Sequence, residues 1–237
     1  MTKLPVVQHP IFNINVPSLK KEYKFRPFLV KEEKLLLMAK ESQSETDIFT
    51  AIKQIVQNCS LDPKLDVNKL AIFDLEYIFL KLRSISVDNI VKINFKDFED
   101  SKVYEFDVNI DDISVIFPEK ADNIVKINSK TGIVMKYPSA SLYSDKDFLN
   151  LEKDYLFELI VRCVDKIYDG EEVYEAKNFN KKDIESFLEN LSVKVFDQVQ
   201  AFLTSTPKLE YVINYKNSLG NDRKIVLNKL SDFFSLR

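Results

Sequence analysis

Acidic side chains are the most numerous groups in this sequence that could do chemistry. One run contains Asp111 and Asp112, and a second contains Glu171 and Glu172. Carboxylates hold Mg²⁺ or Ca²⁺ in many proteins. Neither run fits the calcium-loop pattern of alternate acidic residues, a central glycine and a distal glutamate. Because acidic residues are normally surface residues, we favour solvated strand ends, and a metal-dependent enzyme using these four carboxylates is the weaker alternative.

Other catalytic side chains are scarce. The sequence has one histidine, His9, and two distant cysteines, Cys59 and Cys163. A zinc site needs clustered cysteine or histidine ligands at fixed spacing, and a Ser-His-Asp hydrolase usually shows a Gly-x-Ser-x-Gly motif. Both cysteines fall on apolar stripes of predicted helices, so we interpret them as small buried hydrophobic residues. We therefore predict no catalytic residue, no metal ligand and no cofactor.

Phosphate and nucleic-acid binding have little support. The sequence contains no P-loop and no dinucleotide-binding fingerprint. Lys20–Arg26 is a compact basic and aromatic run of the kind that single-strand binders use. The chain nevertheless has 34 basic against 37 acidic residues, which offers no broad positive face. We interpret the run as an edge strand protected by charges, and we predict neither a nucleic-acid partner nor a small-molecule substrate.

The composition is that of a globular protein with a substantial core. Of the 237 residues, 45% are hydrophobic and 30% are charged, and only three are glycine. So few glycines argue against phosphate loops and against many tight hairpins. No stretch approaches the roughly 18 apolar residues of a membrane span, and the first residues lack the apolar core of a signal peptide. We expect a cytoplasmic location without direct membrane insertion.

The first part of the chain alternates between strand and helix patterns. The expected elements are an extended arm over residues 1–29 that ends in an edge strand, helices over 31–41, 44–59 and 73–86, and strands over 89–95 and 103–110. Phe25 and Phe28 should join the arm to the body. Leu35, Leu36 and Met38 should bury the first helix.

The remaining pattern mixes strands and helices. The expected elements are strands over 113–118, 123–128 and 131–138, a long helix over 145–169, helices over 181–191 and 193–205, and a hairpin of strands over 208–215 and 223–230. We place Gly132 at a turn and Gly170 at the stop of the long helix. The strands from Asn89 onward should form one small antiparallel sheet.

These elements predict an α+β fold, in which helices pack with small antiparallel sheets and hairpins. We expect a first part over residues 1–140, with the arm, helices and sheet. A helical part over 141–237 would then carry the C-terminal hairpin. The boundary is soft, since no linker is evident, and a single domain is the alternative.

Five segments occur in an order that resembles a known family. They are KFRPFLVKEEKLLLMAKES, AIKQIVQNC, KLDVNKLAIFDLEYIFLKLRSISV, GIVMKYPS and CVDKIYDGEEVYEAK. Together they resemble the baseplate hub assembly protein family of T-even-type contractile-tailed phages. The resemblance runs from about Lys24 to the C-terminal LSDFFSL.

The resemblance implies a protein without enzymatic activity that helps to build the central hub of the tail baseplate, as an assembly factor or minor component. Its implied partners are other phage baseplate hub proteins, in the host cytoplasm or in the virion tail. A permanent structural subunit is the alternative. Some relatives place cysteine pairs in two hairpins, where this chain has FKDFEDSKVY and YKNSLGNDRK without cysteine. Alternation and packing must therefore hold these hairpins together.

Candidate partner contacts come from the matching segments and from the chain end. They are Phe25, Arg26, Phe28, Tyr168, Asp169, Glu171, Glu172, Phe233 and Phe234. Aromatic residues anchor protein interfaces, and exposed strand edges can be extended by a partner strand. We expect Arg26 to remain solvated, and we favour core packing for at least one of the two C-terminal phenylalanines.

Overall fold

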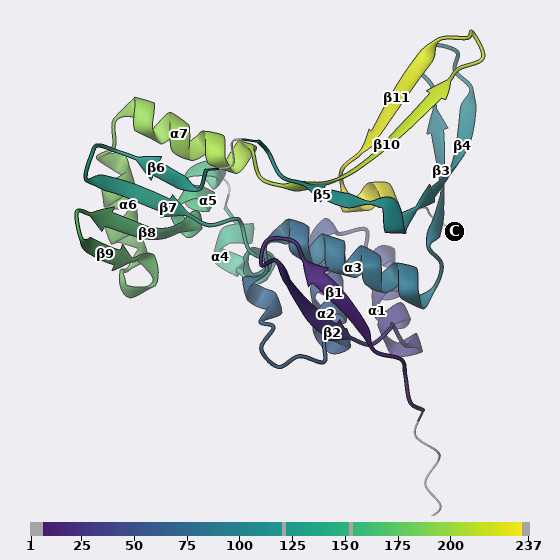
Figure 1. Ribbon diagram of the computed structural model, residues 1–237, viewed down its shortest axis with the longest axis horizontal. Coiled ribbons are helices and arrows are strands. Elements are labelled where there is room, and N and C mark those ends of the chain that lie inside the picture. Colours follow the sequence, from purple (N-terminus) through teal and green to yellow (C-terminus); the bar gives the residue numbers. More distant parts are fainter. Residues whose placement is uncertain (1–6, 120–121, 152–153, 234–237) are drawn as a thin grey trace, which may run out of the picture. The chain divides into compact units, whose positions relative to one another are not determined.

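The computed structural model describes residues 7–119, 122–151 and 154–233 (Figure 1). Its helices and small antiparallel sheets confirm the α+β class. The chain forms two compact units, one from residues 1–116 and 208–237 and the other from residues 117–207. The C-terminal hairpin therefore belongs to the same unit as the N-terminal helices. The soft domain boundary at residue 140 stays a prediction.

The first unit contains three helices and several short strands. These are β1 (Phe12–Val16), β2 (Lys21–Phe25), α1 (Val30–Glu41), α2 (Glu45–Cys59), α3 (Ile72–Ser86), β3 (Ile90–Lys96), β4 (Val103–Asn109), β5 (Ser114–Ile116), β10 (Lys208–Lys216) and β11 (Asp222–Leu227), with short 3-10 helices at Val67–Lys69, Ile110–Asp112 and Leu230–Phe233. The arm is thus a β1–β2 hairpin, in which Phe12 pairs with Phe25. Helix α2 begins at the predicted cap, since Ser44 Oγ accepts a hydrogen bond from Asp47 N.

Helix α3 is the centre of the first unit. It contacts α2, β1, β5 and β10, and its buried side chains lie on several sides of the helix. Helix α1 is more peripheral: Leu36 is buried, but Met38 is 69% exposed. The prediction that Met38 is buried was wrong. Met38 follows Leu36 by two residues, which places it far around a helix from the face that Leu36 buries.

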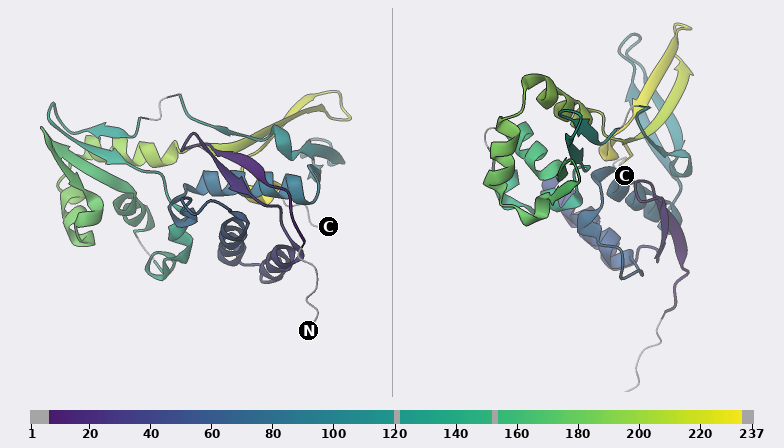
Figure 2. Two further views of the ribbon diagram at one scale, coloured as in Figure 1. Left: turned by 60° about the horizontal axis from the view of Figure 1, so that its bottom comes forward. Right: turned by 60° about the vertical axis from the view of Figure 1, so that its left-hand side comes forward.

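The second unit is a four-stranded sheet with helices on one face (Figure 2). Its elements are β6 (Ile124–Lys126), β7 (Thr131–Met135), α4 (Lys146–Leu149), α5 (Tyr155–Cys163), β8 (Val164–Asp169), β9 (Glu172–Glu175), α6 (Lys181–Glu189) and α7 (Val193–Thr204), with 3-10 helices at Ala140–Ser144 and Ala176–Asn178. The strands lie in sequential order, β6-β7-β8-β9, and all pairs are antiparallel. Val125 and Ile133 on one face pack against residues of α5, α6 and α7.

Three predictions about this unit were wrong. The long helix over 145–169 is replaced by α4, α5 and strand β8, because residues 164–169 pair with β7 and β9. Short apolar runs fit both periods, and available strand partners decide between them. Gly170, with φ 62°, lies in the β8–β9 turn and ends no helix. Gly132 lies within β7 and not at a turn.

The strands from Asn89 onward also do not form one sheet. Strands β3 and β4 pair with each other, β5 pairs with β10, and β6 and β7 join β8 and β9. Strand alternation identifies the strands but not their partners, and here several partners lie far along the chain. The two cysteines are buried, as predicted. Burial raises the pKa of Cys59 to about 11 and that of Cys163 to about 12.

Candidate functional site: the tips of two paired hairpins

Two hairpins from distant parts of the sequence lie side by side in the first unit, β3–β4 and β10–β11 (Figures 1 and 2). They meet through aromatic side chains. The ring of Tyr215 lies 5.1 Å from those of Tyr104 and Phe106, and 6.4 Å from that of Phe95, between ring centroids. These separations are typical of favourable aromatic pairs. Tyr215 therefore joins the second hairpin to the inner face of the first.

A buried carboxylate lies at the tip end of this aromatic cluster. Asp97 is completely buried, and its Oδ2 atom accepts hydrogen bonds from the hydroxyl of Tyr215 and from Arg223 Nε, the latter at 3.1 Å. Its Oδ1 atom accepts from Glu99 N at 2.7 Å. The hydrogen bond from Tyr215 is the main reason why the pKa of Asp97 is lowered. A buried charge is tolerated because it is both paired and hydrogen-bonded.

The two loops beyond Asp97 are joined by further hydrogen bonds. Glu99 accepts from the amides of Asn217 and Asn221, at 2.7 Å each. Asp100 Oδ2 accepts from Ser218 N at 3.0 Å and from Ser218 Oγ at 2.8 Å. Hydrogen bonds to charged groups are stronger than neutral ones. We call this set the tip network: Asp97, Glu99, Asp100, Asn217, Ser218, Asn221, Tyr215 and Arg223.

The tip network holds exposed apolar side chains in the same loops. Phe98 is 87% exposed, and Leu219 in the opposite loop is 61% exposed. The Phe98 ring lies at the edge of the cluster, with its centroid 6.1 Å from that of Phe95. Exposed aromatic side chains on an ordered backbone are typical anchors for protein partners. The tip is thus a candidate contact surface that the sequence analysis did not identify.

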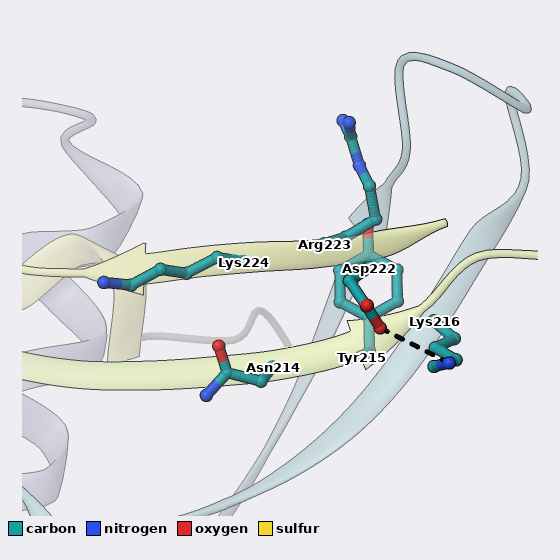
Figure 3. Close-up of a pocket in the computed structure, with 6 residues that line it drawn as sticks. All are labelled: Asn214, Tyr215, Lys216, Asp222, Arg223 and Lys224. Carbon is teal, nitrogen blue, oxygen red and sulfur yellow. Dashed lines mark ion pairs between the residues drawn. The ribbon is translucent and has the colours of Figure 1, made fainter. Parts of the chain in front are cut away.

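The surface of β10 and β11 near the tip is open, and the residues that line it carry polar or charged groups. It is lined by Asn214, Tyr215, Lys216, Asp222, Arg223 and Lys224 (Figure 3). Lys216 Nζ lies 3.6 Å from Asp222 Oδ1, across the ends of the two strands. Small-molecule sites are usually enclosed and mostly apolar, with a few polar groups. This surface is open and not enclosed, and charged or polar groups of six residues border it, so it does not have the form of a small-molecule site.

The predicted contacts Phe25, Arg26 and Phe28 lie at the junction of β2 and α1. Phe25 is completely buried, and the Phe28 ring centroid lies 5.5 Å from that of Phe79 in α3. Both residues therefore make contacts inside the unit. Arg26 was expected to remain solvated, and that expectation was wrong. Its two terminal nitrogens lie 3.0 and 3.1 Å from the carboxylate oxygens of the fully buried Glu32.

Glu32 has two roles in this junction. Its carboxylate also accepts a hydrogen bond from Leu29 N at 3.0 Å, which caps the first turn of α1. Burial alone would raise the pKa of Glu32. The hydrogen bonds from Arg26 and Leu29 outweigh burial, so the pKa is lowered. A planar, bidentate partner and a helix terminus together keep this carboxylate charged inside the protein.

The second group of predicted contacts lies at the β8–β9 turn. Asp169, Glu171 and Glu172 are exposed, and Tyr168 is half-buried. Asp169 Oδ1 accepts a hydrogen bond from the Thr131 hydroxyl at 2.8 Å. These four residues are close in sequence and on one turn, so the structure brings them together at an accessible place. Whether they contact a partner stays a prediction.

One of the two C-terminal phenylalanines is buried in the first unit. Phe233 is completely buried at the end of the last 3-10 helix. Phe234 lies outside the described residues. Phe233 therefore contributes to the core of the first unit. An anchor for a partner at this end of the chain would need another residue.

One of the acidic residues proposed for a metal site, Asp111, has other partners. Asp111 accepts hydrogen bonds from Ser84 Oγ at 2.7 Å and from Asn89 Nδ2 at 3.3 Å. Within residues 7–119, 122–151 and 154–233, no three histidine, cysteine or acidic side chains gather in a way that could hold a metal ion. In the same described part of the chain, no helix is long and apolar enough to cross a bilayer.

The hairpin tips and exposed turns are candidate surfaces for protein contact. Comparison with protein families gives the class of the protein. A family model described as T4 bacteriophage base plate protein matches residues 9–235. The chain belongs to this family, and the resemblance found in the sequence is confirmed. No curated protein and no solved structure matches the chain.

Proposed function

We propose that this protein is an assembly factor for the central hub of the phage tail baseplate, without enzymatic activity, and that it acts through contacts with other hub proteins. Membership of the base plate family supports a role in the tail baseplate. The observation that carries the proposal is the tip: Phe98 is 87% exposed on a loop that the tip network holds in place. A side chain so exposed contributes little to folding and is available for a partner.

The tip network explains how such a contact gains affinity. Binding costs free energy when flexible loops must be ordered at the interface. Glu99 and Asp100 join the first loop to the second before any partner arrives. A partner pocket that receives Phe98 therefore needs to order few further groups. Most of the apolar burial then contributes to binding.

A permanent structural subunit of the baseplate is the alternative, since it needs the same kind of surface. A metal-dependent enzyme using Asp111, Asp112, Glu171 and Glu172 has less support. Asp111 is already engaged by Ser84 and Asn89, and the described residues offer no three-ligand group. We propose the host cytoplasm as the site of assembly, with docking through a partner if assembly occurs at a membrane.

The first experiment is a tagged pull-down from infected cells, combined with mass spectrometry of finished particles. Baseplate hub proteins in the pull-down and no peptides in the particle support a transient assembly factor. Peptides in both support the structural subunit. Absence of hub proteins from the pull-down contradicts the proposal.

The tip itself is tested by Phe98→Ser in the same pull-down. The expected result is loss of the hub proteins with unchanged thermal stability, because Phe98 is almost fully exposed. Val193→Ser is the matched control, since Val193 is another highly exposed apolar residue, 78% exposed at the start of α7. Equal recovery of hub proteins with Phe98→Ser and the control would contradict a role for the tip.

A further inference from the structure

The outer edge of the second unit's sheet is an open strand. Strand β9 pairs with β8 on one side only and is the last strand of the sheet (Figure 1). Asp169 and Glu172 flank a two-residue turn, so they form a hydrogen-bonded pair, and the pairs alternate from there. Tyr168 and Val173 are consequently a non-hydrogen-bonded pair. The backbone N–H and C=O of Val173 therefore point away from β8.

Nothing in the described residues occupies these groups. Neither the backbone nor the side-chain hydrogen bonds of residues 7–119, 122–151 and 154–233 include one to the backbone of Val173. The Val173 side chain is 57% exposed. Strand β9 contains neither lysine nor proline, the residues that most often protect an edge from pairing. The edge is thus available to a further strand.

The negative charge around this edge favours a partner strand that carries positive charge. Residues 169–175 contain four acidic residues and no basic one. Glu175 forms ion pairs with Lys166 at 3.3 Å and with Lys177 at 3.7 Å, and the ion pairs among the described residues include none of the other three. Asp169 and Glu172 have hydroxyl partners, which leave their negative charge in place. A second copy of this acidic edge would be repelled, whereas a basic segment would be attracted.

We propose that β9 binds an extended, basic segment of a protein partner, which adds to the sheet as a fifth strand. The segment donates to and accepts from the Val173 backbone, places an apolar side chain beside Val173, and directs lysine or arginine side chains toward Glu171 and Glu172. Main-chain hydrogen bonds supply affinity in this mode, and alternate side chains supply specificity. This inference rests on the proposed function in one respect, that the chain acts through protein contacts.

A substitution can block the edge without disturbing β8. Val173→Pro removes an N–H that points outward, and proline is tolerated on edge strands. Val173→Thr keeps the N–H and the preference for strand structure, so it is the matched control. Glu171→Lys with Glu172→Lys reverses the charge at the edge. Glu189→Lys with Asp197→Lys makes the same change of net charge at exposed positions on α6 and α7.

The test uses the isotope-labelled full chain and a short synthetic peptide in which lysine and valine alternate. The expected result is that the peptide shifts the amide NMR signals of Val173 and Glu175, and that a matched peptide with glutamate in place of lysine does not. Val173→Pro and the double reversal at residues 171 and 172 should weaken binding by roughly tenfold or more, the scale of one lost hydrogen bond or charge contact. The two control variants should bind as the unchanged protein does.

Four results would overturn the inference: no shift at Val173, shifts centred elsewhere, equal binding of the acidic peptide, or binding that is insensitive to Val173→Pro. Shifts that depend on protein concentration without peptide would assign the edge to a second copy instead. Phage complementation separates this inference from the proposed function. Normal baseplates in a phage without the protein would contradict the proposed function. Normal baseplates in a phage with Val173→Pro would contradict only the role of the edge.

Discussion

The ring of Tyr168 lies directly over Gly132, its cross-strand neighbour in β7. A Cβ atom added at Gly132 would lie 2.3 Å from the hydroxyl oxygen of Tyr168 and 2.5 to 2.7 Å from two of its ring carbons, which is closer than side chains normally approach. The two residues therefore form one packing unit on the sheet face opposite the helices. The tyrosine of the predicted contact segment has a structural role in addition to any contact with a partner.

Gly132→Ala is expected to destabilise the second unit by about 1–3 kcal/mol, because the tyrosine ring must leave its position or the strands must shift. In the double variant with Tyr168→Ala the added methyl meets no ring, so the two effects should be less than additive. Urea unfolding of the four proteins of this cycle measures the coupling. An additive cycle would contradict the close contact.

Arg26→Met is expected to destabilise the first unit by about 3–5 kcal/mol, because it leaves the buried Glu32 carboxylate without its partner. Lys31→Met is the control. Lys31 lies 3.7 Å from the same carboxylate but is mostly exposed, so its loss should cost less than about 1 kcal/mol. Arg26→Lys should fall between them, since lysine lacks the planar fork. Thermal unfolding that is equal for Arg26→Met and Lys31→Met would refute the importance of this pair.

Asp97→Asn is expected to loosen the hairpin tips and to remove a pH dependence. The pKa of Asp97 is lowered in the folded protein, mainly by the hydrogen bond from Tyr215. A lowered folded pKa contributes stability above the unfolded value of about 3.9, and this stability is lost as pH falls through the folded value. The difference in unfolding free energy between the unchanged protein and Asp97→Asn should shrink below about pH 4. A difference that stays constant into acid would contradict the assignment.

For Glu76 in α3 we expect the opposite dependence of stability on pH. Burial raises its pKa from 4.5 to about 7. As pH rises, the unfolded chain therefore loses this proton before the folded chain does, and the free energy of unfolding falls between about pH 4.5 and 7. The shift corresponds to at most roughly 3 kcal/mol, and the exposed part of the side chain makes the loss smaller. Glu76→Gln should remain more stable than the unchanged protein at pH 8 and similar to it at pH 4. Chemical denaturation at these two pH values measures the difference, and equal curves at pH 8 would refute it.

Much of the local structure follows from the sequence because local forces decide it. The helix at Ser44 begins where a hydroxyl can cap it, and Asn180 with Asp183 caps α6 in the same way. Strict alternation over β3, β4, β10 and β11 identified both hairpins. The resemblance of the matching segments to the phage baseplate family was also available from the residues alone.

The tip network could not be read from the sequence. The residue types that form it are visible in the sequence, since one hairpin loop is acidic and the other carries two asparagines and a serine. The bond between Tyr215 and Asp97, however, joins residues 118 positions apart. No local rule states which of several polar loops will meet, because loop position depends on how the hairpins pack.

The sequence by itself therefore determined the family, the α+β class, the positions of most helices and strands, and the burial of both cysteines. These depend on composition, short-range periodicity and capping, which act within a few residues. Only the tertiary structure decided that residues 164–169 form a strand, that Arg26 pairs with the buried Glu32, that Met38 is exposed, and that Phe98 lies on a tip held by a second hairpin. These features depend on partners distant in the chain, and an isolated segment contains no information about which distant surface will cover it.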